Sequence, residues 1–534
     1  MTTYPNRILN YDQQNNMKTQ KDLFLLASVF ITGTAVLVIE ILATRILSPY
    51  YGNTIYTTSS VIGTVLAALS LGYYFGGKFA DRHPDQRIFY GIITISGLLI
   101  IIMQITGKTI LPLMGVMFSI VSGPLIASMA LFFVPAFCLG ILSPFAIKLY
   151  EKGNETIGSK AGEVFFWSTL GSITGTLLAG FVLIPYLGIN AIVLSTGALL
   201  GIWGLLGILF SHQKNRGGVL LTMASILVAS LIAWQNSQGV TAQTLYEQDG
   251  VYEKIKIMEG QWSDPSRTPT AVGGEQPVRF LFQDRSYSAA MYLNSPELVY
   301  DYTKYYALYK LFKPEATTSL VMGGGAYSIP KALLNDSLAM QVDVAEIEPR
   351  LFSLAKQYFN VIESPRLTNH IQDGRQLLKL NDKHYDAIIS DVYYSLFSVP
   401  IHFTTKEFFS LAKSRLSENG VFVGNYAGYL QGEQPSFIGS EITTFKEVFP
   451  NSYFFAVNSP TSEKGQNIIF LGINGEKRID FDSNLVKNNP DPILRNLANK
   501  NITLSSLDLA NNFQITDDYA PVEHLISKII DQWH

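Results

Sequence analysis

Cysteine is nearly absent from this sequence, and its charges are balanced. One cysteine, Cys138, occurs among the 534 residues, inside an apolar run, so the sequence predicts neither a disulfide framework nor a zinc cluster. The 39 Lys and Arg residues and the 42 Asp and Glu residues leave a formal net charge of −3. This balance gives no argument for a nucleic-acid partner. We therefore expect neither a bound metal nor nucleic acid.

Nearly all long apolar runs lie before Gln235. Seven of them approach or exceed the roughly 20 residues that a membrane-spanning helix needs. They are Leu23–Leu42, Ile55–Phe75, Ile88–Ile105, Leu125–Ile147, Val164–Tyr186, Ala191–Phe210 and Val219–Trp234. An eighth run, Ile110–Val121, is short and contains Pro112; it fits a further span, a re-entrant piece or an interfacial helix. The sequence predicts a transmembrane domain over residues 21–236, after a disordered polar tail at residues 1–20.

Small residues recur at four-residue spacing in two of these runs. Gly72 and Gly76 form one pair, and Gly171, Gly175 and Ala179 form a longer series. Small side chains let helices approach closely in lipid. We therefore predict that these residues serve helix packing.

The basic loops predict the orientation of the membrane domain. Residues 78–87, 148–160 and 214–216 carry the basic residues. With seven spans and a cytoplasmic N-terminus, all three loops are cytoplasmic, as the positive-inside rule requires. Seven spans place the C-terminal domain outside, whereas eight return it to the cytoplasm but expose two basic loops. Both topologies stay open, and the binding of a cellular nucleotide favours a cytoplasmic domain.

The stretch from Ser319 to Pro349 has the pattern of a nucleotide-binding unit. A short apolar run precedes Gly323, Gly324 and Gly325, a helical pattern follows, and a second β-type run ends near an acid, Glu346. Glycine allows a tight turn and a close approach of the backbone to a ligand. An acid about twenty residues further on is where doubly wound folds bind a ribose hydroxyl pair.

The second half of the chain alternates between strands and helices. Residues 237–297 read as a linker and a small β-hairpin module, and residues 298–534 as an α/β domain. Such alternation predicts a parallel sheet covered on both faces, with ligands outside the carboxyl ends of the strands. The predicted strand ends carry Gly323–Gly325, Glu346, Asp373–Gly374 and Asp391. These residues come from four successive strands, so we expect one site.

The motifs in this order resemble the spermidine synthase (polyamine aminopropyltransferase) family. They are LYEQDGVYEKIKI, YDYTKYYAL, VMGGGAYSIP, VAEIEP, IQDGRQLL and YDAIISD, within roughly residues 244–475. IEILATRILSPYYG and STLGSITGTLLAGFVLIPYLG resemble the spans of membrane-fused bacterial members, which implies a bacterial inner membrane. The fold class expected is a multi-pass α-helical membrane domain plus an α/β Rossmann-like, methyltransferase-type domain preceded by a small β-module.

The resemblance implies a site for an adenosyl-sulfonium co-substrate, either S-adenosylmethionine or its decarboxylated form. The glycines at 323–325 would lie under this ligand. Glu346 would bind the ribose hydroxyls, with Glu348 at the neighbouring acidic position. Asp373, with Gly374 beside it, would meet the adenine amino group.

The amine-binding half of the expected site departs from the family. Ala326 stands at the aspartate of G-G-G-D-G, Tyr394 at the second aspartate of D-x-x-D-P, and Glu253 at the glutamine of Y-Q. An ammonium loses charge-assisted hydrogen bonds when those carboxylates are gone, and tyrosine, with a pKa near 10, is a poor base at neutral pH. Asp391, at the first aspartate of D-x-x-D-P, and Tyr394 are the expected catalytic residues. The expected substrate contacts are Glu253, Asp284, Tyr300, Tyr327 and Tyr393.

Three functions remain open from the sequence. The first is a membrane-anchored transferase that makes a polyamine and methylthioadenosine, or a related lyase, cyclase or methyltransferase. The second is a nucleotide sensor that regulates the membrane half, and the third is a transporter with an accessory domain. The scarcity of ionisable groups inside the spans argues against a transporter. The expected partners are a small amine or other nucleophile, the lipid bilayer and a second copy of the chain.

Overall fold

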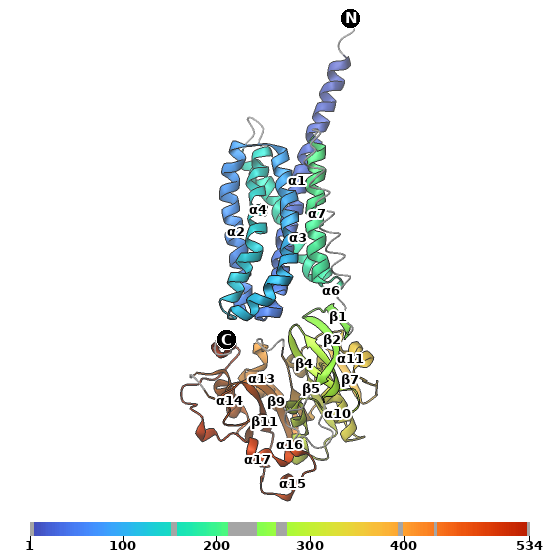
Figure 1. Ribbon diagram of the computed structural model, residues 1–534, viewed down its shortest axis with the longest axis vertical. Helices are drawn as coiled ribbons and strands as arrows, with labels where there is room; N and C mark the ends of the chain where they lie inside the picture. The colour runs from blue at the N-terminus through green and yellow to red at the C-terminus, as the bar shows by residue number, and fades with distance from the viewer. Residues whose placement is uncertain are drawn as a thin grey trace. The chain divides into compact units, whose positions relative to one another are not determined.

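The computed structural model describes residues 5–150, 157–211, 243–262, 275–393, 399–431 and 435–530 (Figure 1). The chain divides into two compact units, residues 1–240 and residues 241–534. The first unit is helical, and the second is built on two β-sheets.

Long apolar helices make up the first unit. Their bounds are α1 (Pro5–Tyr51), α2 (Ile55–Arg82), α3 (Gln86–Met117), α4 (Gly123–Tyr150), α5 (Ile157–Leu178), the π-helical turn η1 (Ala179–Leu183), α6 (Ile184–Tyr186) and α7 (Ile189–Phe210). Within the described residues, 6 helical stretches are long and apolar enough to cross a membrane, α5 to α6 counting as one. The remaining predicted span, Val219–Trp234, lies outside the described residues.

The structure differs from the sequence-based expectation at two places in this unit. α1 begins at Pro5, inside the segment expected to be disordered, because residues 6–22 contain no glycine or proline and proline is tolerated in a first helical turn. The run Ile110–Val121 does not form a helix of its own. Its residues up to Met117 continue α3, with Pro112 inside that helix.

Glycines set the distance between the membrane-type helices. α2 packs on α4 and α3 packs on α7 (Figure 1), and α1 packs on α5. A Cβ atom on Gly72 would lie 2.6 Å from the carbonyl oxygen of Phe137, and one on Gly171 would lie 2.1 Å from that of Phe30. No side chain fits at such distances, so the glycines permit the close approach. The packing role predicted for these small residues is confirmed.

The second unit begins with a small antiparallel sheet. Its strands are β1 (Thr244–Asp249), β2 (Lys254–Trp262), β3 (Gln276–Gln283) and β4 (Ser286–Tyr292), and they pair in chain order. Ile255 and Ile257 are fully buried and join one apolar cluster with Leu351 and Leu354. Because Leu351 and Leu354 belong to a helix of the main domain, this cluster fastens the β-module to that domain.

The main sheet has seven strands in the order β10-β11-β9-β8-β5-β6-β7. Their bounds are β5 (Thr318–Met322), β6 (Gln341–Glu346), β7 (Leu367–Ile371), β8 (Tyr385–Ser390), β9 (Leu416–Gly428), β10 (Ser452–Ala456) and β11 (Gln466–Ile473). β5 to β9 are parallel, as predicted, but β11 runs antiparallel to both β9 and β10. The short connection 457–465 allows a hairpin and not a crossover. This mixed sheet is the predicted methyltransferase-type arrangement.

Helices and helical turns connect the strands of the main sheet. The longer ones are α10 (Ser328–Asp336), α11 (Leu351–Tyr358), α12 (Gly374–Leu380), α13 (Lys406–Ser414), α14 (Phe437–Val448) and α18 (Val522–Ile530). The shorter ones are α9 (Asp301–Lys304), η2 (Tyr305–Leu311), η3 (Ile401–Phe403), α15 (Asn484–Lys487), α16 (Pro492–Arg495), α17 (Leu497–Lys500) and η4 (Leu504–Ser506).

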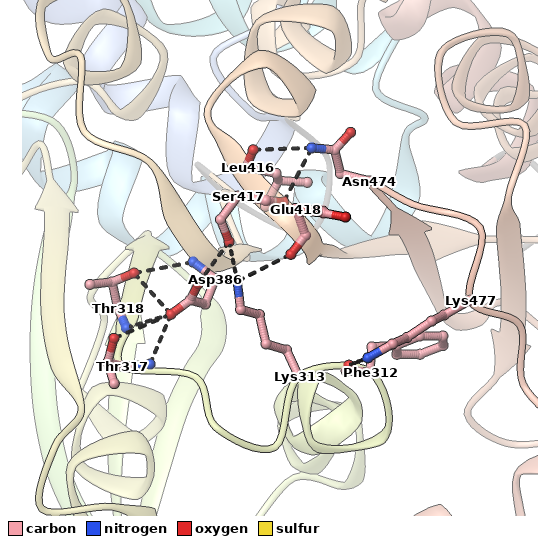
Figure 2. A network of polar contacts seen from close by, with 10 residues as sticks. All are labelled: Phe312, Lys313, Thr317, Thr318, Asp386, Leu416, Ser417, Glu418, Asn474 and Lys477. Atoms are coloured by element: carbon pink, nitrogen blue, oxygen red, sulfur yellow. Dashed lines mark hydrogen bonds and ion pairs between the residues drawn. The ribbon is translucent and has the colours of Figure 1, made fainter.

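A polar network centred on Asp386 ties together the amino ends of the central strands (Figure 2). One carboxylate oxygen of Asp386 accepts hydrogen bonds from the backbone N–H groups of Thr317, at 2.8 Å, and Thr318, at 3.2 Å. The other accepts from the Ser417 hydroxyl at 2.7 Å and lies 2.7 Å from the Lys313 ammonium. The network therefore holds β5, β8 and β9 at the end opposite their carboxyl ends.

Candidate active site

The glycine turn after β5 lies where the strand order reverses. β5 pairs with β6 on one side and with β8 on the other, and β8 pairs with β9 on its far side. The connection from β5 to β6 and the connection from β8 to β9 therefore run in opposite directions. Such a switch point is where open α/β sheets bind ligands. Gly323 has a φ of 88°, and a Cβ there would lie 2.2 Å from the Asp391 carbonyl oxygen. Only glycine satisfies both conditions, so Gly323 lets the loops after β5 and β8 meet.

Glu346, at the end of β6, is bound to the glycine turn. One of its carboxylate oxygens accepts the N–H of Gly324 at 2.8 Å and that of Gly325 at 3.3 Å; the other accepts the N–H of Glu348 at 2.8 Å. Burial raises the pKa of Glu346, and these backbone donors oppose the rise. These three hydrogen bonds fix the side chain in place. They occupy three of the roughly four lone-pair sites of the carboxylate, so the oxygen that faces Glu348 can still accept one hydrogen bond from a hydroxyl group.

Asp373 caps the helix after β7. Its carboxylate accepts the N–H of Gln376 at 2.8 Å, and its second oxygen lies 2.8 Å from Nε2 of His402. Burial would raise the pKa of Asp373, but the His402 and Gln376 contacts outweigh it and lower the pKa. Behind this pair, Arg375 donates to both oxygens of Asp517, at 2.8 and 2.6 Å, and to the carbonyl of His402. The segment around Asp517 thereby supports Asp373 and His402 from outside the pocket lining.

Asp391, which follows β8, accepts the last hydrogen bond of a chain of two side-chain amides. The side-chain amide of Asn467 donates to that of Asn425 at 2.9 Å, and Asn425 donates to Oδ1 of Asp391 at 2.9 Å. Burial raises the pKa of Asp391, and the hydrogen bonds from Asn425 and Tyr302 oppose the rise. Asn425 and Tyr302 are both neutral, so they orient the carboxylate without neutralising its negative charge.

These strand ends open into one pocket of about 240 Å³. Its lining includes four acids, namely Glu253, Glu346, Asp373 and Asp391, together with the glycine turn. Among the described residues that line it there is no lysine, arginine or histidine. The pocket is therefore electrostatically suited to a positively charged ligand.

The β-module supplies one of the four acids. Glu253, just before β2, is 7% exposed and accepts a hydrogen bond from the Gln283 amide. Burial raises its pKa well above the ordinary range of a carboxyl group, Gln283 opposes this, and the nearby Glu346, Asp284 and Glu348 raise it further. Glu253 thus brings a second buried acid close to Glu346.

Tyrosines form much of the remaining wall. Tyr300 and Tyr302 line the pocket with stacked rings, 5.9 Å between centroids. The Tyr300 hydroxyl is buried and has no hydrogen-bond partner among the described residues. Tyr393 also lines the pocket, but its hydroxyl accepts the N–H of Ala427 at 2.6 Å and donates to the carbonyl of Asn425. The Tyr300 hydroxyl is therefore buried and unpaired among the described residues, while the Tyr393 hydroxyl is used to hold β9 at the pocket wall.

Three predicted site residues do not line this pocket, because each is held elsewhere. Glu348 accepts the N–H groups of Val251 and Tyr252 and so clamps a loop of the β-module. Asp284, with a φ of 55°, caps the turn after β3 by accepting the N–H of Lys254. Tyr327 is fully buried in the main core, where it contacts Phe352 and donates to Asn369.

Other predicted site residues are placed as follows. Gly324, Gly325 and Gly374 line the pocket with Gly323. Tyr394, predicted as a catalytic residue, lies outside the described residues.

Sequence reasoning missed several polar residues of the site. Asn425 follows the apolar core of β9, so the rule that ligands bind at strand ends was a signal for it. His402 lies on η3, between β8 and α13, but no local pattern links it to Asp373. The partners Gln283, Asn467 and Asp517 come from distant segments, and no local pattern predicted their contacts with the site.

Comparison with known proteins agrees with the expected family. Residues 307–483 match the family model described as "Spermine/spermidine synthase domain". A polyamine aminopropyltransferase of Vibrio vulnificus is 27% identical over 228 residues, which are 42% of this chain and 70% of that protein. Against the polyamine aminopropyltransferase of Streptococcus pneumoniae, the match spans 54% of the relative's length. The resemblance predicted from the motifs is confirmed.

A longer match involves a different transferase. The N-terminal histidine N-methyltransferase of Emericella nidulans is 24% identical over 465 residues, covering 80% of this chain and 77% of that protein. Among solved structures, a probable spermidine synthase of Corynebacterium glutamicum is 19% identical, covers 52% of this chain and 97% of its own, and has a TM-score of 0.41. This score is low, and the fold assignment rests on the strand order. The second unit thus has a spermidine synthase-like segment on a methyltransferase-type sheet.

Proposed function

We propose that the chain is a membrane-anchored transferase that uses an adenosyl-sulfonium donor and transfers an aminopropyl group to an amine. The observation that carries this proposal is the pocket at the switch point, where four acids and no basic residue occur among the described lining residues. A decarboxylated S-adenosylmethionine carries a sulfonium and an ammonium and no carboxylate. Its charge therefore complements that of the lining.

The strand-end residues have the chemistry to hold the nucleoside of such a donor. The glycine turn lets the adenosyl group approach the backbone. Glu346 has an acceptor site left for a ribose hydroxyl, and Asp373 has one for the adenine amino group. Each of these acids is held in place by hydrogen bonds within the chain.

Asp391 is the proposed proton acceptor for the transfer. The amine nitrogen attacks the carbon next to the sulfonium, the carbon–sulfur bond breaks, and its electron pair stays on sulfur. Methylthioadenosine leaves as a neutral thioether, and the proton of the attacking nitrogen passes to the Asp391 carboxylate. The amide chain from Asn467 through Asn425 orients that carboxylate, as general-base catalysis requires.

Methyl transfer from S-adenosylmethionine is a second candidate function. The match to the histidine N-methyltransferase favours it, because that match extends over 80% of this chain. The replacement of the family's amine-binding aspartates at Ala326 and Tyr394 also weakens the case for a diamine acceptor.

Incubating the purified full chain with each donor and a panel of amines, followed by mass spectrometry, tests both candidates. Methylthioadenosine together with an aminopropylated amine supports the first. Adenosylhomocysteine with a methylated acceptor supports the second, and methylthioadenosine without any acceptor identifies a lyase or cyclase. Binding of a donor without any product would replace both with a nucleotide-sensing role.

A further inference from the structure

The pocket contains an acid that the motif pattern does not explain. Glu253 stands where the resembled family has a glutamine, and Ala326 stands where it has an aspartate. Both residues line the same pocket. One acid is therefore lost from this cavity and another is gained, and the gained one comes from the β-module.

The loop that carries Glu253 is held on both sides. Glu348 accepts the N–H of Val251 at 2.7 Å, and Asp284 accepts the N–H of Lys254 at 3.0 Å. The backbone carbonyl of Glu253 accepts the N–H of Gly250 at 2.7 Å. Its carboxyl group is therefore fixed at the pocket wall, with Gln283 on one oxygen.

We propose that Glu253 recognises the positive charge of the donor. Its carboxylate pairs with the sulfonium or the alkyl ammonium of the bound adenosyl ligand. This inference rests on the proposed function, because it assigns a role within the same pocket. It makes Glu253 a specificity-determining residue that separates cationic donors from neutral thioether nucleosides.

The surroundings of Glu253 explain how a ligand changes its charge. The acids Glu346, Glu348 and Asp284 face it from three neighbouring segments and disfavour its ionised form, as burial does. The adjacent Lys254 ammonium contacts Glu247 at 2.6 Å, on the exposed side of the module. A cation brought by the ligand favours the ionised carboxylate. A cationic donor is therefore expected to displace a proton from Glu253, and a neutral nucleoside is not.

Calorimetric titration of the full chain in detergent tests the inference with three ligands. Methylthioadenosine is neutral, S-adenosylmethionine adds a sulfonium, and the decarboxylated donor adds a sulfonium and an unbalanced ammonium. Glu253→Gln keeps the shape of the side chain and removes its charge. The matched control is Glu247→Gln, an acid-to-amide change in the same β-module at a residue outside the pocket lining.

We expect Glu253→Gln to weaken the binding of the cationic ligands roughly ten- to hundredfold, the usual range for a charge-assisted contact. The affinity for methylthioadenosine should stay unchanged. A loss for both cationic ligands identifies the sulfonium as the group recognised, and a loss for the decarboxylated donor alone identifies the ammonium. The control variant should bind all three ligands like the wild type.

Proton release provides a second readout that does not depend on affinity. Titration in two buffers with different ionisation enthalpies should show a proton released from the wild type by a cationic donor, and none from Glu253→Gln. An equal loss of affinity for methylthioadenosine and the cationic ligands, or no loss for any, overturns the inference. Failure of the wild type to bind any of the three ligands overturns the proposed function itself.

Discussion

Replacing Asp386 with asparagine should destabilise the second unit, and the effect should depend on pH. Burial alone would raise the pKa of Asp386, but the Lys313 ammonium, the Thr317 N–H and the Ser417 hydroxyl lower it from 3.8 to about 2 (Figure 2). A carboxylate with a depressed pKa in the folded state stabilises that state above its unfolded pKa. The shift corresponds to about 2 kcal/mol at neutral pH.

The stabilisation is lost as the pH falls through the interval between these two pKa values. About half of it should remain near pH 3, where the folded-state carboxylate is still largely ionised. We therefore expect Asp386→Asn to lower the free energy of unfolding by about 2 kcal/mol near pH 7 and by about half of that near pH 3. The measurement is urea unfolding of residues 241–534, followed by circular dichroism at both pH values.

An exposed ion pair provides the control for this experiment. Asp382 lies 2.9 Å from Arg415, and its side chain is 98% exposed, so Asp382→Asn should change the stability little. If Asp386→Asn leaves the unfolding free energy near pH 7 unchanged, or if the loss is the same at both pH values, the electrostatic account of the network is wrong.

Four further predictions concern the site and the membrane unit. Glu346→Ala should weaken the binding of methylthioadenosine by about 1–3 kcal/mol in calorimetry; equal affinity would remove Glu346 from the site. Asp391→Asn should lower turnover by about 10²–10⁴-fold at nearly unchanged nucleotide affinity, and unchanged turnover would refute its role as the base. Gly72→Val should lower the thermal stability of the detergent-purified chain. Gly63→Val should not, because nothing lies within 4 Å of a Cβ added there. Equal thermal unfolding midpoints for the two variants would contradict the close-packing argument. A reporter at the N-terminus should be cytoplasmic, and one at His534 decides which side holds the second unit.

The sequence alone was sufficient to locate the strand ends that carry the site. An apolar run followed by Gly323, Gly324 and Gly325 and then, about twenty residues on, by an acid is a local pattern. The carboxyl ends of parallel strands meet at one edge of the sheet. For these reasons Glu346, Asp373 and Asp391 could be assigned to a common site before their geometry was known, and the order of the motifs was enough to indicate the family.

Only the tertiary structure decided which distant residues lie beside Glu346, Asp373 and Asp391 in the site. Asp517 reaches Arg375 across 142 residues of sequence, and Glu253 comes beside Glu346 because a separate sheet packs on α11. Tyr327 follows the glycine turn in sequence and was expected at the site. Its backbone is left-handed, with a φ of 56°, and its ring is buried in the core. Local patterns encode strands, turns and helices. Contacts between remote segments depend on how the sheets pair and pack, which hydrophobic periodicity does not specify.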